Sequence, residues 1–358
     1  PFNTLLSFSE LFDYSVTDSI FYMTFSNSLG GISSFVFSSQ LGKKWNKLSL
    51  LRVVAWVVML VTVFVFGFAI GRPSQTWGMP VLVFGSFLAG FFNSSFQSLS
   101  FSLAAETSPE AIQSCSAGTG FAGVSTNVAC CLLNLILPPR DTRGKILPEV
   151  LERQVYGFSL FALIVYAFFF SAMDLYSPKR QVARSEASVD STMRGAKKIL
   201  IRSMDINLGI FMNYLTTANI CGFWIYKSFR VFYRPGSLPL ALYFFLFNFG
   251  DAVAKTMPVR VLPSTSSQAH ALNFLKILAN FYFFLIGSQA MREHIFGAFN
   301  RLLIVFLVGL SNGYLTNAYM VLNAKRFDSP AMKGDAGFFN VFFLLVGLTT
   351  GSFISLLL

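Results

Sequence analysis

A polar stripe on the apolar segment 238–257 is the best candidate for chemistry in this chain. Asn248, Asp251 and Lys255 follow one another at helical spacing, so a helix would place an amide, a carboxylate and an ammonium group on one face. A charge inside a bilayer costs at least about 2.5 kcal/mol, and such residues therefore mark function. The alternative is an ion pair that only joins helices. This interpretation has weight because the pair lies near the end of the segment, where the Lys255 side chain could reach the interface.

A second polar stripe lies on the segment 79–105. Asn93, Gln97 and Ser100 are spaced i, i+4 and i+7. Amide side chains both donate and accept hydrogen bonds, so they suit recognition of a polar ligand. Amides also join helices in lipid, and this interpretation stands beside the first.

Other ionisable residues near apolar segments have simpler explanations. Arg52 begins the segment 48–70, and Lys276 lies in the first two turns of the segment 271–290. We expect both to extend toward the membrane interface. We expect His270 and His294 to be loop residues without partners.

Composition requires lipid as the solvent for much of this protein. Of its 358 residues, 54% are hydrophobic and 12% are charged. Soluble domains carry about 25% charged residues, so a water-exposed surface cannot be built here. The net charge of +11 then reflects basic cytosolic loops and not nucleic-acid binding. The four cysteines have no metal-binding spacing, and no catalytic set or phosphate loop is present. We expect no enzyme, no metal, no cofactor and no nucleic-acid partner.

Ten segments are long enough to cross a hydrocarbon core of about 30 Å as helices. They are 19–39, 48–70, 79–105, 117–137, 155–175, 208–228, 238–257, 271–290, 302–322 and 336–358. The sequence therefore predicts an all-α, polytopic membrane helix bundle.

One long polar loop divides these segments into two sets of five, the layout of a transporter with two related halves. We predict an N-terminal bundle over 1–176, a basic loop over 177–206 and a C-terminal bundle over 207–358. The loop carries seven basic residues: Lys179, Arg180, Arg184, Arg194, Lys197, Lys198 and Arg202. Such a cluster predicts a cytosolic loop, and either contact with anionic lipid or simple solvation would suit it. With ten segments, both ends of the given chain would face outward. Because it starts at Pro1 and not at a methionine, we expect a further helix before it, which would place the N-terminus in the cytosol.

Small residues recur at helical spacing in two of the segments. Gly118, Gly120 and Gly123 open one segment, and Gly347 and Gly351 lie in the last one. Helix backbones approach closely at such positions, so we predict tight helix packing there.

Several of these motifs occur in the order known from one transporter family. They are Pro1-Phe2-Asn3, Gln97, the stretch Gly118-Thr119-Gly120-Phe121-Ala122-Gly123, the pattern Asn248-x-x-Asp251-x-x-x-Lys255, Ser311-Asn312-Gly313-Tyr314-Leu315, and Ala336-Gly337 with Phe343, Gly347 and Gly351. On these residues the chain resembles the equilibrative nucleoside transporter family from its first residue to its last. The resemblance implies eleven helices, ten of them present here, in a fold like the major facilitator superfamily with one helix fewer.

The resemblance also implies roles for individual residues. Asp251 and Lys255 would bind the ribose hydroxyls of a nucleoside, and Gln97 and Asn3 would contact polar edges of the base. The base plane would lie between Phe2 and Leu348. Arg52 would act as a gate or balance the charge of Asp251.

The sequence departs from the family pattern at three of these positions. Lys255 replaces an arginine, Phe2 a tryptophan and Thr119 a glutamine. A lysine offers a point charge where arginine offers a fork of donors, so the chain resembles a divergent member of the family.

We therefore predict a carrier for nucleosides or nucleobases that works by alternating access, in the plasma membrane. A carrier for another polar solute, such as a sugar or an amino acid, is the first alternative. A membrane receptor or interaction protein is the second, and an integral membrane enzyme the third. Passive and proton-coupled transport both remain open, since Asp251 could serve either.

Overall fold

The computed structural model describes residues 22, 25–35, 37, 47–70, 75–138, 147–176, 193–219, 238–285 and 298–357. Within these ranges the chain is helical, with short turns and no strand. The all-α prediction is confirmed.

The first half of the chain contributes long helices. They are α3 (Lys47–Ile70), α4 (Gln75–Thr107), α5 (Pro109–Ile136) and α6 (Pro148–Tyr176), and residues 25–35 are helical as well. The start of α5 shows how local sequence sets a boundary. The Ser108 hydroxyl accepts a hydrogen bond from the Ala111 amide at 3.1 Å, and Pro109 occupies the first helical position.

The second half supplies both long and short helices. They are α7 (Met193–Arg202), α8 (Met204–Asn219), α10 (Leu238–Lys255), the 3₁₀ turn η3 (Val259–Val261), α11 (Ser266–Leu285), α13 (Ala298–Lys325) and α14 (Pro330–Leu357). Every predicted segment falls on a helix where the structure describes it, except that the segments 117–137 and 238–257 run one and two residues past the ends of α5 and α10. Three helical stretches meet the length and apolar composition of a membrane span among the described residues: Pro109–Ile136, Leu302–Lys325 and Pro330–Ile354.

The helix α7 was not predicted, because it lies within the basic segment 177–206. Ile199 is its buried residue and packs with Phe327 and Ala336, while Lys197 and Lys198 are exposed. A segment rich in charges can thus form a short amphipathic helix once one apolar face finds a partner. The division into two bundles and a loop stays a prediction.

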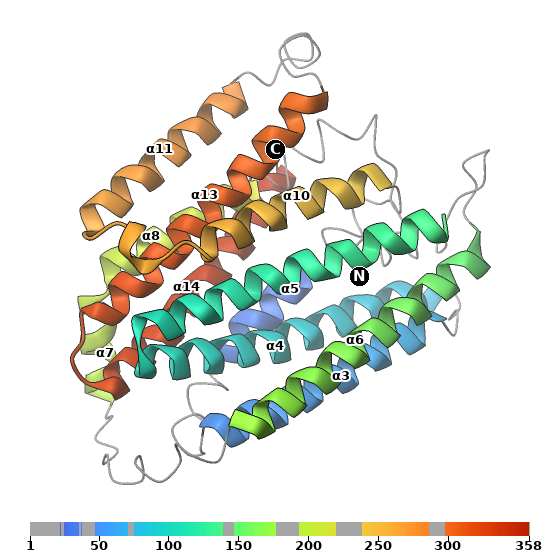
Figure 1. Ribbon diagram of the computed structural model, residues 1–358, viewed down its shortest axis with the longest axis horizontal. Coiled ribbons are helices and arrows are strands. Elements are labelled where there is room, and N and C mark those ends of the chain that lie inside the picture. Colours follow the sequence, from blue (N-terminus) through green and yellow to red (C-terminus); the bar gives the residue numbers. More distant parts are fainter. Residues whose placement is uncertain are drawn as a thin grey trace.

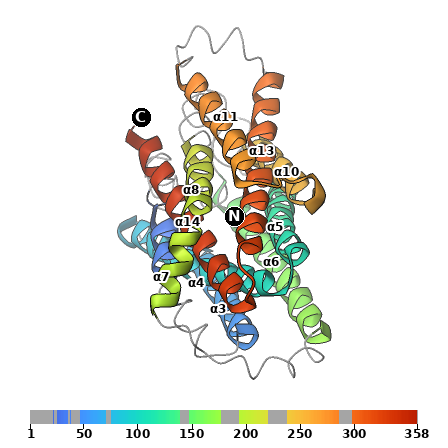
Figure 2. The ribbon, with the colours of Figure 1, turned by 90° about the vertical axis from the view of Figure 1, so that its left-hand side faces the viewer.

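The helices form two groups that meet along a shared seam. Figure 1 shows α3, α4 and α6 on one side and α8, α11 and α13 on the other, and Figure 2 shows the same separation from a second direction. Across the seam, two helices of the first half of the chain pack against two of the second: α5 against α10, and α4 against α14. At one end of the seam, the Gln113 amide of α5 donates to the carbonyl oxygen of Met257, just after α10, at 2.5 Å.

Glycines allow the close approach of helices at this seam and beside it. A Cβ atom on Gly120 would lie 2.7 Å from the Cα of Ala252, and the position of Gly123 faces the Asn248 side chain. In α14, Gly347 and Gly351 face backbone carbonyls of α8. Gly118 differs, since nothing in the described part of the chain lies within 4 Å of its Cβ position.

Candidate functional site

Asp251 and Lys255 form a buried ion pair near the end of α10. Lys255 Nζ lies 2.6 Å from Asp251 Oδ2, and the two residues are 6% and 5% exposed. Both belong to one helix, one turn apart, so the pair by itself does not join two helices. What it joins depends on the neighbouring side chains.

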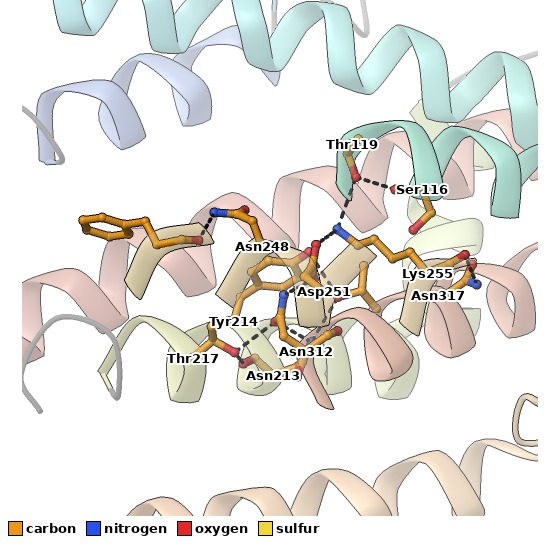
Figure 3. Close-up of polar contacts among 12 residues, drawn as sticks. Ser116, Thr119, Asn213, Tyr214, Thr217, Asn248, Asp251, Lys255, Asn312 and Asn317 are labelled. Carbon is orange, nitrogen blue, oxygen red and sulfur yellow. Dashed lines mark hydrogen bonds and ion pairs between the residues drawn. The ribbon is translucent and has the colours of Figure 1, made fainter. Parts of the chain in front are cut away.

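Those neighbours come from both sides of α10 (Figure 3). Lys255 Nζ donates to Thr119 Oγ1 of α5 at 3.2 Å, and Asn312 Nδ2 of α13 donates to Asp251 Oδ1 at 2.9 Å. The ion pair therefore lies between a helix of the N-terminal half and a helix of the C-terminal half.

Small residues bring α10 and α13 together at this level. A Cβ atom on Gly250 would lie 2.9 Å from the Leu310 nitrogen, and one on Gly313 would lie 3.0 Å from the Asp251 carbonyl carbon. Without this close approach, the short Asn312 side chain could not reach the Asp251 carboxylate.

Asn312 also contacts α8, on the side away from Asp251. Its Oδ1 lies 3.2 Å from Asn213 Nδ2 and 2.9 Å from Thr217 Oγ1, and Figure 3 shows Asn312 between these side chains and Asp251. Asn213, Thr217 and Asn312 are all buried. The sequence analysis did not assign any of them to the site. The Ser311-Asn312-Gly313-Tyr314 stretch was a signal for Asn312, whereas Thr217 gave none.

Two expectations about ionisable residues are wrong. Lys276 does not extend to the interface: it is 8% exposed and donates hydrogen bonds to Asn213 and Thr217. His270 is not a loop residue: it lies in α11, and its Nδ1 is 3.1 Å from the Tyr319 hydroxyl. In both cases the helix turns the side chain toward neighbouring helices, which sequence position alone does not reveal. His294 lies outside the described residues.

Asn248 shares the face of Asp251 but not its contacts. Its Nδ2 donates to the Phe244 carbonyl of its own helix at 2.8 Å, and its side chain fills the space beside Gly123. The predicted three-residue stripe is therefore a two-residue pair with an amide that packs at the α5–α10 crossing.

The remaining predicted site residues are spread over other helices. Gln97 is partly buried on α4 and forms no hydrogen bond with any described residue, and its contact with a substrate stays a prediction. Leu348 of α14 packs against the main apolar core. Arg52 lies in α3, which packs against α4 and α6. Phe2 and Asn3 lie outside the described residues, so their predicted contacts with the base stay predictions.

Charged residues at the ends of the helices form a separate group. Arg326, after α13, binds both carboxylate oxygens of Asp205 at the start of α8, with Nη2 2.5 Å from Oδ2. This hydrogen bond lowers the pKa of Asp205. In the other half, Lys47 of α3 pairs with Glu106 of α4.

The fold is similar to those of two transporters of known structure. A bacterial homologue of the iron transporter ferroportin, in its outward-facing state, superposes with a TM-score of 0.59 at 16% identity, covering 99% of this chain and 88% of that one. The human organic anion transporter MFSD10 gives a TM-score of 0.58 at 17% identity, covering 99% of this chain and 82% of that one. At such identities the likeness concerns the fold alone. It places the chain among helical bundles like those of the major facilitator superfamily, and this part of the prediction is confirmed.

A family model matches part of the sequence. The family model of nucleoside transporters matches residues 199–358, the part of the chain that contains α8, α10, α11, α13 and α14. The resemblance inferred from the motifs is confirmed over this range, and the matching family is one of membrane transporters and not of enzymes. No curated protein sequence matches the chain.

Proposed function

We propose that this protein carries nucleosides across the membrane by alternating access, and that Asp251 and Lys255 bind the ribose. The observation that carries the proposal is their ion pair, buried between α5 and α13 at the seam of the two halves. The family match over α10 and α13 supports the choice of substrate class.

The chemistry of the pair suits a vicinal diol. An ionised carboxylate only accepts hydrogen bonds and an ammonium group only donates them, whereas each ribose hydroxyl does both. Hydrogen bonds to charged groups contribute about 1.5–3 kcal/mol each. A diol that contacts both groups would therefore gain more from this pair than a substrate without hydroxyls.

The location of the pair suits a mechanism in which the halves move. Lys255 contacts Thr119 across the seam, through one neutral hydroxyl. A bound diol that takes over this hydrogen bond would loosen one link between the halves while keeping the charge of Lys255 compensated. Substrate binding and rearrangement of the halves would then be coupled through one side chain.

Asp251→Asn in the full-length protein tests the ribose role. We expect radiolabelled nucleoside uptake into proteoliposomes to fall close to background while the protein still folds, because the amide loses the charge that strengthens binding to the diol. Uptake of 2′,3′-dideoxynucleosides should fall much less. Equal loss for both kinds of substrate would reject ribose binding by Asp251.

Lys255→Arg is the matched variant, because it keeps the charge and adds the fork of donors typical of the family. We expect ribonucleoside affinity to be maintained or raised.

Competition by inosine but not by glucose would separate a nucleoside carrier from a carrier of another polar solute.

The orientation and the membrane are part of the same proposal. We infer that the segment 177–206 faces the cytosol and that the protein works in the plasma membrane. A cysteine at Ser188 should resist an impermeant thiol reagent on intact cells and react after permeabilisation. Uptake measured with and without a pH gradient separates passive from proton-coupled transport.

A further inference from the structure

Lys276 of α11 ends in the polar interior of the C-terminal half. Its Nζ donates to Asn213 Oδ1 at 2.6 Å, to Thr217 Oγ1 at 2.6 Å and to the Asn213 carbonyl oxygen at 3.2 Å. These three acceptors match the three protons of an ammonium group. All of them belong to α8, which separates Lys276 from Asp251.

The contact with Lys276 determines which way the Asn213 amide points. An ammonium group has only donors, so the amide must turn its oxygen toward Lys276. The nitrogen of the same amide then faces the opposite side, where it donates to Asn312 Oδ1 and to Thr316 Oγ1, each at 3.2 Å.

The same argument applies one step further to Asn312. Its Oδ1 accepts from Asn213, and it also lies 2.9 Å from Thr217 Oγ1. The Thr217 oxygen accepts a hydrogen bond from Lys276, and its own hydroxyl proton is donated to Asn312 Oδ1 or to the Asn213 carbonyl oxygen. With its oxygen on the α8 side, Asn312 presents its nitrogen to Asp251 Oδ1 at 2.9 Å, the orientation that the acceptor-only carboxylate also requires.

We propose that Lys276 is a positioning residue for the ribose site and acts through Asn213 and Asn312. It sets the direction of the Asn213 amide, whose nitrogen then supports the Asn312 oxygen, so that the Asn312 nitrogen and Asp251 are held in place for the substrate diol. Without this donor the Asn213 amide can turn over, which would bring its oxygen against Asn312 Oδ1 and displace Asn312 from Asp251. The inference rests on the proposed function, since it assigns Lys276 a part in recognising the same diol.

A purely structural role for Lys276 is the competing explanation. Lys276 would then only join α11 to α8, and its loss would weaken the binding of every substrate to the same extent. The two explanations differ in diol selectivity, which is the ratio of KM for a 2′,3′-dideoxynucleoside to KM for the ribonucleoside.

The test uses uridine and 2′,3′-dideoxyuridine uptake by the full-length protein in proteoliposomes. Lys276→Met keeps the length of the side chain and removes its donors. We expect it to raise the KM for uridine about tenfold, the effect of losing roughly one hydrogen bond to a charged group, and to change the KM for dideoxyuridine less than about twofold. Lys276→Gln retains an N–H donor without the charge and should stay within about threefold of wild type for both substrates.

A second variant interrupts the same path without leaving Lys276 unpaired. Asn213→Asp offers Lys276 a carboxylate but offers Asn312 no donor, so it should also raise the KM for uridine selectively. Asn312→Leu completes a double-mutant cycle: once Asn312 is absent, adding Lys276→Met should cause no further change in diol selectivity.

Three results would overturn the inference. They are an equal rise in KM for both substrates, additive effects of Lys276→Met and Asn312→Leu on selectivity, and unchanged selectivity in Asn213→Asp. If Lys276→Met does not fold, Asn213→Asp decides alone. If the wild-type protein shows no saturable uridine uptake, the proposed function is overturned as well. If the wild type takes up uridine and the variants keep its diol selectivity, only the inference is overturned.

Discussion

The two halves of the molecule satisfy their buried polar groups in different ways. In the N-terminal half, α3 and α4 pack through an apolar cluster that includes Leu50, Val54 and Leu99. Buried polar groups of this half bond within one helix, as Ser95 does to the Phe91 carbonyl, or in separate pairs between two helices, as Gln154 of α6 does with Asn134 of α5 at 2.9 Å. In the C-terminal half, polar side chains bond across α8, α10, α11 and α13.

This difference determines which amino-acid substitutions each half tolerates. An apolar face accepts many residue types of similar volume. A network that crosses four helices needs each donor opposite an acceptor, so a change at one position leaves buried partners unsatisfied. The half with the network is also the half in which the nucleoside transporter family is recognised, over residues 199–358.

The two halves also place their charges differently. Lys47 and Glu106 pair where α3 begins and α4 ends, whereas Asp251 and Lys255 lie within α10 and are more deeply buried. The comparison therefore predicts larger effects from substitutions in the C-terminal half.

The largest expected effect is that of Lys255→Met. It leaves the Asp251 carboxylate buried without its cation, which typically lowers the free energy of unfolding by about 3–5 kcal/mol. Equilibrium unfolding in detergent measures this loss, and Asp251→Asn in the same protein should recover part of it. Lys47→Met is the matched change in the other half and should cost less. Equal losses for the two lysines would break the comparison.

The next effect concerns the seam between the halves. Gly120→Ala places a Cβ atom 2.7 Å from the Cα of Ala252, and backbone cannot yield as a side chain can. We expect a loss of about 1–3 kcal/mol in the free energy of unfolding.

Gly118→Ala is its control and should have the opposite sign. Its Cβ meets no described atom within 4 Å, and alanine favours a helix over glycine by up to about 1 kcal/mol. Thermal unfolding of both variants checks the pair. A stabilising Gly120→Ala would mean that α5 and α10 pack less closely than described.

A smaller effect is expected for Gln97→Ala, in the half that packs mainly through apolar groups. The loss of one neutral hydrogen bond to the substrate costs about 0.5–1.5 kcal/mol, or two- to twelvefold in affinity. The KM for purine nucleosides should rise at normal surface expression. A fall in surface expression at unchanged KM would show that Gln97 joins helices and does not contact the substrate.

The smallest effect is expected for Asp205→Asn, which removes an ion pair at the end of the bundle. Exposed pairs contribute at most about 1 kcal/mol, and the Asp205 side chain is 46% exposed. Its pKa lies below the usual value of about 3.9 because Arg326 donates hydrogen bonds to the carboxylate. The pair thus stabilises the fold at neutral pH, and this contribution is lost as the pH falls through the lowered pKa. Thermal unfolding should separate wild type from variant between about pH 5 and 8, and the difference should vanish in acid, below the lowered pKa of Asp205. A difference that persists in acid would assign the effect to packing.

Much of the architecture could be predicted from sequence because hydrophobicity acts locally. A run of about twenty apolar residues is a helix in lipid whatever surrounds it, since each backbone group must be satisfied within the segment. The pair Asp251 and Lys255 could be predicted for the same reason, because its geometry belongs to one helix. The helix α7 could not, because its apolar face depends on Phe327, far away in the chain.

What the sequence by itself determined was therefore the set of helices and the one charged pair that a single helix positions. Only the tertiary structure decided which side chains complete the site. Lys276 lies early in its segment, and the sequence suggested an extension to the interface; the packing of α11 on α8 instead directs it to Asn213. Hydrogen bonds form between atoms about 3 Å apart, and that distance is set by how helices pack and not by spacing along the chain.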